Sequence, residues 1–199
     1  MSQKTSCFKI GDSLKGKLLV APPTMLDNRF FNSLILITSH DSNGAVGLVI
    51  NKKSAHQFHH IVSNIDKNFN LEEINTSGKQ VNIVLGGPMH SNSIFILHSN
   101  DYHEDTSLPI NEYLSMTNKP DLIIKLAQNH GPYHSLISIG CSTWSPQQLE
   151  KELQSYGWLI TDYNEDFIHH DADNLYNLAM DSLGINNSNY ALFLHNTQK

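Results

Sequence analysis

The chain has little cysteine and no long apolar run. Its two cysteines, Cys7 and Cys141, form neither a CxxC motif nor a disulfide framework. No apolar stretch approaches the ~18 residues that cross a bilayer, and the first 17 residues lack the apolar centre of a signal peptide. These absences predict a soluble, cytoplasmic protein of a reducing compartment, with no membrane partner.

Basic residues are scarce as well. The chain has 13 Lys and Arg against 19 Asp and Glu, a formal net charge of −6, and no run of four basic residues. Because contacts with phosphate backbones need clustered Lys and Arg, direct binding to nucleic acid is disfavoured. The length of 199 residues predicts one domain over residues 1–199 that buries roughly 70% of its unfolded surface.

Short apolar runs and helical periodicities succeed one another irregularly. The runs predict strands at residues 17–21, 34–38, 45–51, 81–85, 93–98, 135–139, 158–161 and 190–194. The periodicities predict helices over about 54–64, 118–130, 145–157 and 171–183. The turn residues at 40–44 predict a hairpin of the second and third strands. Because hairpins come first and helices follow no βαβ order, the pattern favours an α+β fold.

Several helix ends carry specific predictions. Ser54 and Asp171 are each expected to cap a helix, and Gly131 and Gly184 to end one. The segment SPQQ at residues 145–148 predicts a helix start with Ser at the cap, Pro at the first position and Gln completing a capping box.

The stretch GCSTW at residues 140–144 resembles the nucleophile elbow, Gly-x-Ser-x-Gly between a strand and a helix. It fails at its fifth position, where Trp144 stands instead of the glycine that the crowded elbow requires. Three readings remain: Ser142 as a hydrolase nucleophile, Cys141 as a reactive thiol, or two small packed side chains beneath Trp144. The last is favoured. Acids and histidines that could complete a triad do follow, at Asp162, Asp166, Asp171, His169, His170 and His195.

Twelve histidines make metal sites worth testing. His56, His59 and His60 have helical spacing that can bind zinc, but no acidic residue lies among them, so we expect a solvated face. His169, His170 and Asp173 could also supply ligands, although Asp173 equally suits the positive end of a helix. We predict no metal site and no cofactor.

His98 closes the apolar strand SIFILH, and Asp101, His103, Glu104 and Asp105 follow it. Such a histidine can be an acid–base group or a ligand, or it can be satisfied by a backbone carbonyl, which we favour. The GGP turn at residues 86–88 could offer backbone N–H groups to an anion, or it could be a tight strand connection.

Several motifs in this order resemble the AlgH (YqgE) family of bacterial proteins, over most of residues 16–186. They are GKLLVAP at 16–22, GAVGLVIN at 44–51, LGGP at 85–88, FILH at 95–98, GCSTW at 140–144 with QLE at 148–150, WL at 158–159, and the last helix to LGI at 183–185.

The resemblance implies an α+β fold with a bifurcated, mostly antiparallel sheet curled into a pseudo-barrel and flanked by helices. It also implies a cytoplasmic protein, often labelled a transcriptional regulator, with no established catalytic residue. The family commonly has Gly-Tyr-Ala-Gly-Trp where this chain has residues 140–144, which argues against Cys141 or Ser142 as a shared nucleophile. Tyr176 replaces a usual Trp.

Our leading hypothesis is a regulatory protein that acts indirectly, through an unidentified protein or small-molecule partner, with no catalytic residues. Any binding site is expected near the motif positions that periodicity does not explain: Asn51, Gly86, Gly87, His98 and Trp144. The alternative is a metal-dependent or acid–base enzyme centred on His98, and a purely structural interaction module is a third possibility.

Overall fold

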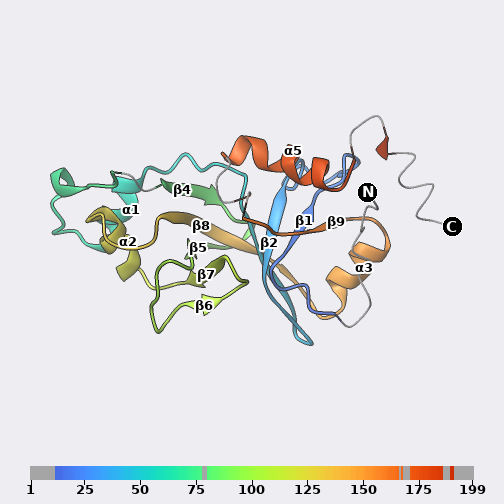
Figure 1. The fold of residues 1–199 in the computed structure, drawn as a ribbon, viewed down its shortest axis with the longest axis horizontal. Coiled ribbons are helices and arrows are strands. Elements are labelled where there is room, and N and C mark those ends of the chain that lie inside the picture. The colour runs from blue at the N-terminus through green and yellow to red at the C-terminus, as the bar shows by residue number, and fades with distance from the viewer. Residues whose placement is uncertain (1–11, 78–79, 166, 168–170, 186–188, 191–199) are drawn as a thin grey trace. The chain divides into compact units, whose positions relative to one another are not determined.

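The structure, a computed structural model, describes residues 12–77, 80–165, 167, 171–185 and 189–190 (Figure 1). Its contacts group the chain into two compact units. The first unit holds Met1–Gly47 and Thr143–Lys199, and the second holds Leu48–Ser142. The prediction of one domain therefore stays a prediction, and each unit is described by itself.

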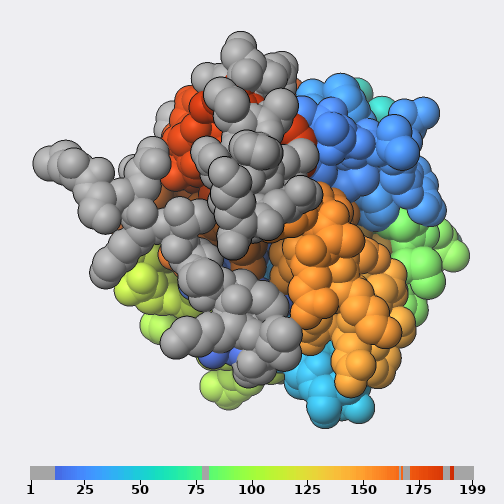
Figure 2. Space-filling view, turned by 90° about the vertical axis from the view of Figure 1, so that its right-hand side faces the viewer, coloured from blue at the N-terminus to red at the C-terminus, as the bar shows by residue number. Residues whose placement is uncertain are grey.

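The first unit is built on strands in the order β3-β2-β1-β9, although the last two residues of β3, Leu48 and Val49, belong to the second unit. Their bounds are β1 Lys17–Val20, β2 Leu34–Asp41, β3 Gly44–Val49 and β9 Leu159–Asp162. Strand β1 pairs antiparallel with both β2 and β9. Two helices accompany these strands, α3 Gln148–Gln154 and α5 Ala172–Ser182. The α3 segment, orange in the space-filling view, lies at the surface of this unit (Figure 2).

The last helix packs against β1 and β2. Leu175, Ala179 and Met180 are its buried face, and the Tyr176 hydroxyl donates to the carbonyl oxygen of Ala21 at 2.8 Å. The helix ends as predicted, because Gly184 adopts a left-handed φ of 66°. The Tyr176 hydroxyl thus joins α5 to the residue that follows β1.

The second unit has strands in the order β6-β7-β5-β8, with β4 on the other edge of β8. Their bounds are β4 Gln80–Leu85, β5 Met89–Ser99, β6 Leu108–Pro109, β7 Leu114–Thr117 and β8 His134–Trp144, whose last two residues belong to the first unit. All of these pairings are antiparallel except that of β4 with β8. The expected α+β class with a mostly antiparallel sheet is confirmed.

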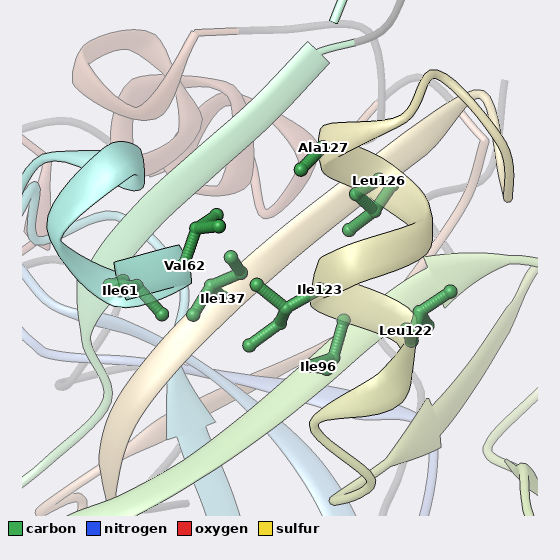
Figure 3. Packing of buried hydrophobic residues seen from close by; sticks show 8 residues of the cluster. All are labelled: Ile61, Val62, Ile96, Leu122, Ile123, Leu126, Ala127 and Ile137. Carbon is green, nitrogen blue, oxygen red and sulfur yellow. The ribbon is translucent and has the colours of Figure 1, made fainter. Parts of the chain in front are cut away.

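Helices α1, Phe58–Ile65, and α2, Asp121–Ala127, cover one face of these strands. A short 3-10 helix, η1 Leu71–Glu73, follows α1 in a stretch for which no helix was predicted. The apolar stripe predicted for α2 is buried, and it meets side chains from α1, β5 and β8 (Figure 3). The cluster consists of Ile61, Val62, Ile96, Leu122, Ile123, Leu126, Ala127 and Ile137.

Two predicted helix starts are wrong, and each has its own reason. The N–H of Ser54 donates to the carbonyl of Ile83 at 2.9 Å, so Ser54 is extended and the helix begins only at Phe58. In the SPQQ segment Gln147 has a left-handed φ of 61°, and α3 begins at Gln148. Half of the capping box survives, because Gln148 Oε1 accepts from the Ser145 N–H at 3.0 Å.

Strand β8 is longer than predicted and contains the whole GCSTW stretch. An elbow needs a sharp turn from strand to helix at the nucleophile. Cys141 and Ser142 instead lie inside a strand, so the elbow reading is wrong.

Some expectations lie outside the described residues. They concern Cys7, Asp166, His169, His170, His195 and most of the strand expected at 190–194. Asp171 does occupy the cap position of α5, although its side chain makes no capping hydrogen bond. Within the described ranges, no helix is long and apolar enough to cross a membrane.

The cluster in Figure 3 predicts a large effect of truncation. Ile123→Ala should lower the free energy of unfolding by about 2–5 kcal/mol, because it opens a cavity in a fully buried site. Leu26, which is 94% exposed, supplies the control, and Leu26→Ala should change the stability by less than about 0.5 kcal/mol. Urea unfolding followed by circular dichroism measures both. Equal effects would contradict this assignment of the core.

Candidate functional site

Three of the five predicted site residues come together in the second unit, at the end of β4. The carbonyl of Gly86 accepts from the N–H of Val49 at 2.9 Å, and its own N–H donates to the carbonyl of Ile139 at 2.9 Å. The N–H of Leu85 donates to the carbonyl of Lys52 at 2.8 Å. Asn51 therefore lies in a segment that runs beside the Gly86–Gly87 turn.

Glycine is required in this turn because the backbone of β8 is too close for a side chain. A Cβ on Gly86 would stand 1.8 Å from Ser138 Oγ and 2.4 Å from the carbonyl oxygen of Gly140. A Cβ on Gly87, whose φ is +148°, would stand 2.4 Å from the Cys141 carbonyl. The close connection explains both glycines without an anion.

Two large apolar side chains flank this rigid turn. Leu85 is 48% exposed and Met89 is 46% exposed. Leu85 is the register partner of Ile139, which in turn pairs with Ile94, and both isoleucines are partly buried. An apolar row therefore crosses three strands and ends at an exposed leucine. Neither side chain is among the predicted site residues, although Leu85 is the first residue of the LGGP motif and Met89 follows its last.

His98 lies elsewhere in the same unit. It pairs with Ser135, four residues along β8 from the Ile139 that meets the turn, which is a separation of about 13 Å along the strand. The side chain is 1% exposed. His98 is thus not brought together with Asn51, Gly86 and Gly87.

Both ring nitrogens of His98 have partners. Nδ1 lies 3.0 Å from the carbonyl oxygen of Ser99, and Nε2 lies 2.8 Å from the hydroxyl of Ser107. A carbonyl can only accept, so Nδ1 carries the proton and donates it. In the neutral ring, Nε2 then accepts from Ser107. The favoured reading of His98, satisfied by a backbone carbonyl, describes half of this arrangement.

Tyr102 connects His98 to a network of charged side chains. The centroid of its ring is 6.0 Å from that of the imidazole. Glu104 accepts hydrogen bonds from the Tyr102 hydroxyl, at 2.8 Å, and from the Lys125 ammonium. Burial opposes ionisation of Glu104, yet these two hydrogen bonds and the charge of Lys125 bring the pKa of its carboxyl below the ordinary value. The same hydrogen bond to Glu104 raises the pKa of Lys125, so this pair is ionised at neutral pH.

Trp144, the fifth predicted residue, belongs to the first unit and is 6% exposed. Its indole N–H donates to Oε2 of Glu152 at 2.9 Å, and the indole of Trp158 donates to the same oxygen at 2.8 Å. The two rings meet edge to face at 6.2 Å. Trp144 anchors the end of β8 to α3, and its polar atom is already used.

The small side chains of the GCSTW stretch are packed. Cys141 is 1% exposed and Ser142 is 2% exposed. Burial raises the pKa of the Cys141 thiol, which keeps it neutral and a poor nucleophile. Within the part of the chain that is described, Ser142 Oγ has no hydrogen-bond partner, and no base stands beside it.

The remaining histidines form no metal centre that the structure describes. His56 Nδ1 lies 2.8 Å from Ser54 Oγ, and the rings of His59 and His60 lie 4.1 Å apart. Among the described residues, no three His, Cys, Asp or Glu side chains are grouped closely enough to hold a metal ion.

Comparisons with known proteins agree with one another. A family model described as AlgH-like matches residues 18–188. A UPF0301 protein of Rhodopseudomonas palustris is 35% identical over 180 residues, covering 88% of this chain and 83% of that relative. A UPF0301 protein of Afipia carboxidovorans is 34% identical over 177 residues, and the match covers 86% of this chain and 84% of that relative.

Two solved structures are similar. The solution structure of the AlgH protein from Pseudomonas aeruginosa superposes with a TM-score of 0.73 at 27% identity, covering 93% of this chain and 96% of that one. A crystal structure of a Corynebacterium diphtheriae protein gives a TM-score of 0.65 at 18% identity, covering 89% and 91%, and it supports the fold alone.

The buried thiol gives a test of the packing around Cys141. In a Cys7→Ser background, Ellman's reagent should modify native Cys141 at least about 100-fold more slowly than the unfolded chain, because the thiol is neutral and inaccessible. Absorbance of the released thiolate measures both rates. If Cys141 reacted as fast in the folded protein as in denaturant, the conclusion that its side chain is packed would be wrong.

The lowered pKa of Glu104 predicts a pH dependence of stability. The group's folded pKa lies below its ordinary value of 4.5, so its contribution to stability is present above that pH and is lost as the pH falls. Glu104→Gln should therefore destabilise the protein more at pH 7 than in the acid range. Urea unfolding across a pH series measures this. Exposed Glu112 supplies the control, and a Glu104→Gln effect that is constant with pH would contradict the prediction.

Proposed function

The chain belongs to the AlgH-like family, and from that premise we propose that it works by binding a protein partner through the Gly86 turn surface, defined as Asn51, Leu85 and Met89. Any effect on transcription, the role with which the family is often labelled, passes through that partner rather than through contact with DNA. The observation that carries the proposal is the pair of exposed apolar side chains on either side of a hydrogen-bonded glycine turn.

The rigidity of the turn supports binding because little conformational entropy is lost when a partner docks. Both the N–H and the carbonyl of Gly86 are hydrogen-bonded. The turn lies so close to the β8 backbone that no side chain fits between them. Preorganised surfaces bind more tightly for the same contact area. The backbone that carries Leu85 and Met89 is therefore held by pairing with β8 on both sides of the turn.

The apolar character of the surface favours a protein over a small polar ligand. Leu85 continues into the cross-strand row of Ile139 and Ile94, so the apolar area exceeds one side chain. Contiguous exposed apolar surface on a folded protein commonly marks an interaction site. The acidic chain, with its net charge of −6, does not favour direct binding to DNA.

The buried thiol also fits the cytoplasmic location that we propose. Cys141 is a free cysteine in the described chain, and a reducing compartment keeps such thiols unpaired.

A charge placed on the turn tests the proposal. Leu85→Glu and Met89→Glu should each weaken capture of the native partner at least about tenfold, because a carboxylate cannot enter an apolar interface without losing its water. Leu108→Glu is the matched control, since Leu108 is 62% exposed in the same unit. Quantitative mass spectrometry of untagged protein purified from its own cells measures the co-purifying partner.

Two outcomes would contradict the proposal. The first is a partner that survives Leu85→Glu and Met89→Glu but is lost with Leu108→Glu. The second concerns the indirect route alone: sub-micromolar, salt-dependent binding of the pure protein to a DNA fragment would show direct contact with nucleic acid.

A further inference from the structure

A hydroxyl and an imidazole meet in the second unit, away from the Gly86 turn surface. Ser107 Oγ lies 2.8 Å from His98 Nε2, inside the range over which a nucleophile and its general base are hydrogen-bonded. We propose that Ser107 and His98 form a nucleophile–base pair that accepts the acyl group of a carboxylic ester. This activity is independent of the proposed binding function.

The tautomer of the imidazole suits this role. Nδ1 donates to the Ser99 carbonyl at 3.0 Å, which fixes the tautomer whose Nε2 lone pair is directed at Ser107. In serine hydrolases a buried carboxylate usually holds the histidine in that tautomer. Here a backbone carbonyl occupies the same position relative to the ring.

The orienting carbonyl is itself held in place. The Ser99 hydroxyl donates to the carboxylate of Asp101, and it accepts from the N–H of His134 at 3.2 Å. Asp101 also accepts from the N–H of Tyr133 at 3.1 Å. Ser99 and Asp101 are therefore positioning residues, which act on His98 through the backbone.

The imidazole is confined on its other sides. His98 is 1% exposed, lies within β5, and meets the Tyr102 ring edge to face at an interplanar angle of 84°. Burial and packing leave the ring one orientation, so the base does not have to be ordered during the reaction.

The residue that carries the hydroxyl, in contrast, is less buried than His98. Ser107 is half-buried, on the segment between β5 and β6, and its neighbour Leu108 is 62% exposed. The N–H of Ser107 donates to the carbonyl of Glu104 at 3.0 Å, which forms a turn. Glu104 is tied in turn to Lys125 and Tyr102. The nucleophile thus lies on a half-buried residue of a segment that Glu104 ties to α2.

The chemistry balances without a cofactor. Ser107 Oγ attacks the ester carbonyl carbon as its proton passes to His98 Nε2. The carbon–oxygen bond to the leaving alcohol then breaks, and that oxygen takes the proton from Nε2. Water, deprotonated by Nε2, attacks the acyl-serine carbonyl. The bond to Ser107 Oγ breaks, Oγ recovers the proton, and the carboxylic acid leaves.

A fluorophosphonate probe tests the pair on the full chain, with the modified residue located by peptide mass spectrometry. We expect labelling at Ser107 in the wild type, none at that position in Ser107→Ala, and at least about a 100-fold slower rate in His98→Asn, in line with the loss of a general base. Ser115→Ala is the matched control, because Ser115 is a half-buried serine of the same unit whose hydroxyl donates to Asn100. It should label normally.

A second measurement does not depend on His98→Asn being folded. In the Cys7→Ser background, Ser107→Cys should react with iodoacetamide near neutral pH at least about tenfold faster than Ser115→Cys, since an adjacent imidazole favours the thiolate. Equal rates, or a folded wild type whose Ser107 takes no more probe than Ser115, would overturn the proposal and leave Ser107 as a structural partner of His98.

Discussion

The close approach of the Gly86–Gly87 turn to the backbone of β8 is the constraint on which the second unit depends. Gly140 completes it from the other strand, since its φ is 77° and a Cβ there would meet the Gly87 carbonyl at 2.7 Å. Three glycines are thus needed at one crossing because two backbones lie where side chains would otherwise stand. The pairing of β4 with β8, the course of residues 49–54 and the exposure of Leu85 all follow from this contact.

Each unit also has a glutamate that accepts hydrogen bonds from several side chains. Glu152 collects two indole N–H groups and, on Oε1, the Gln148 amide at 2.8 Å, and so joins the end of β8 to α3. Glu104 accepts hydrogen bonds from the Tyr102 hydroxyl and the Lys125 ammonium, and so joins the segment before β6 to α2. Hydrogen bonds to an ionised carboxylate are stronger than neutral ones. Both glutamates therefore hold loops that apolar packing alone would leave loose.

The candidate functions draw on opposite properties of the second unit. The Gly86 turn surface combines a rigid backbone with exposed apolar side chains, which suits recognition of a partner. The Ser107–His98 pair combines a buried ring of fixed tautomer with a hydroxyl on a half-buried residue, which suits proton transfer. Cys141 and Ser142, in the motif that looked most like a catalytic one, are closed off within β8.

The sequence by itself determined the elements with strong periodicity or apolar runs, such as the buried stripe of α2 and the strands around Gly86, and its motifs pointed to the family. These features follow from the spacing of apolar residues along the chain, which directly indicates helices and strands. Ser54 and Ser145 failed as caps because strand pairing and a left-handed Gln147 outweighed local preference. Only the tertiary structure decided that Ser107, nine residues from His98 and without any motif, faces its ring. It also decided that Leu85 is exposed while Trp144 is buried, because exposure depends on packing between segments far apart in the chain.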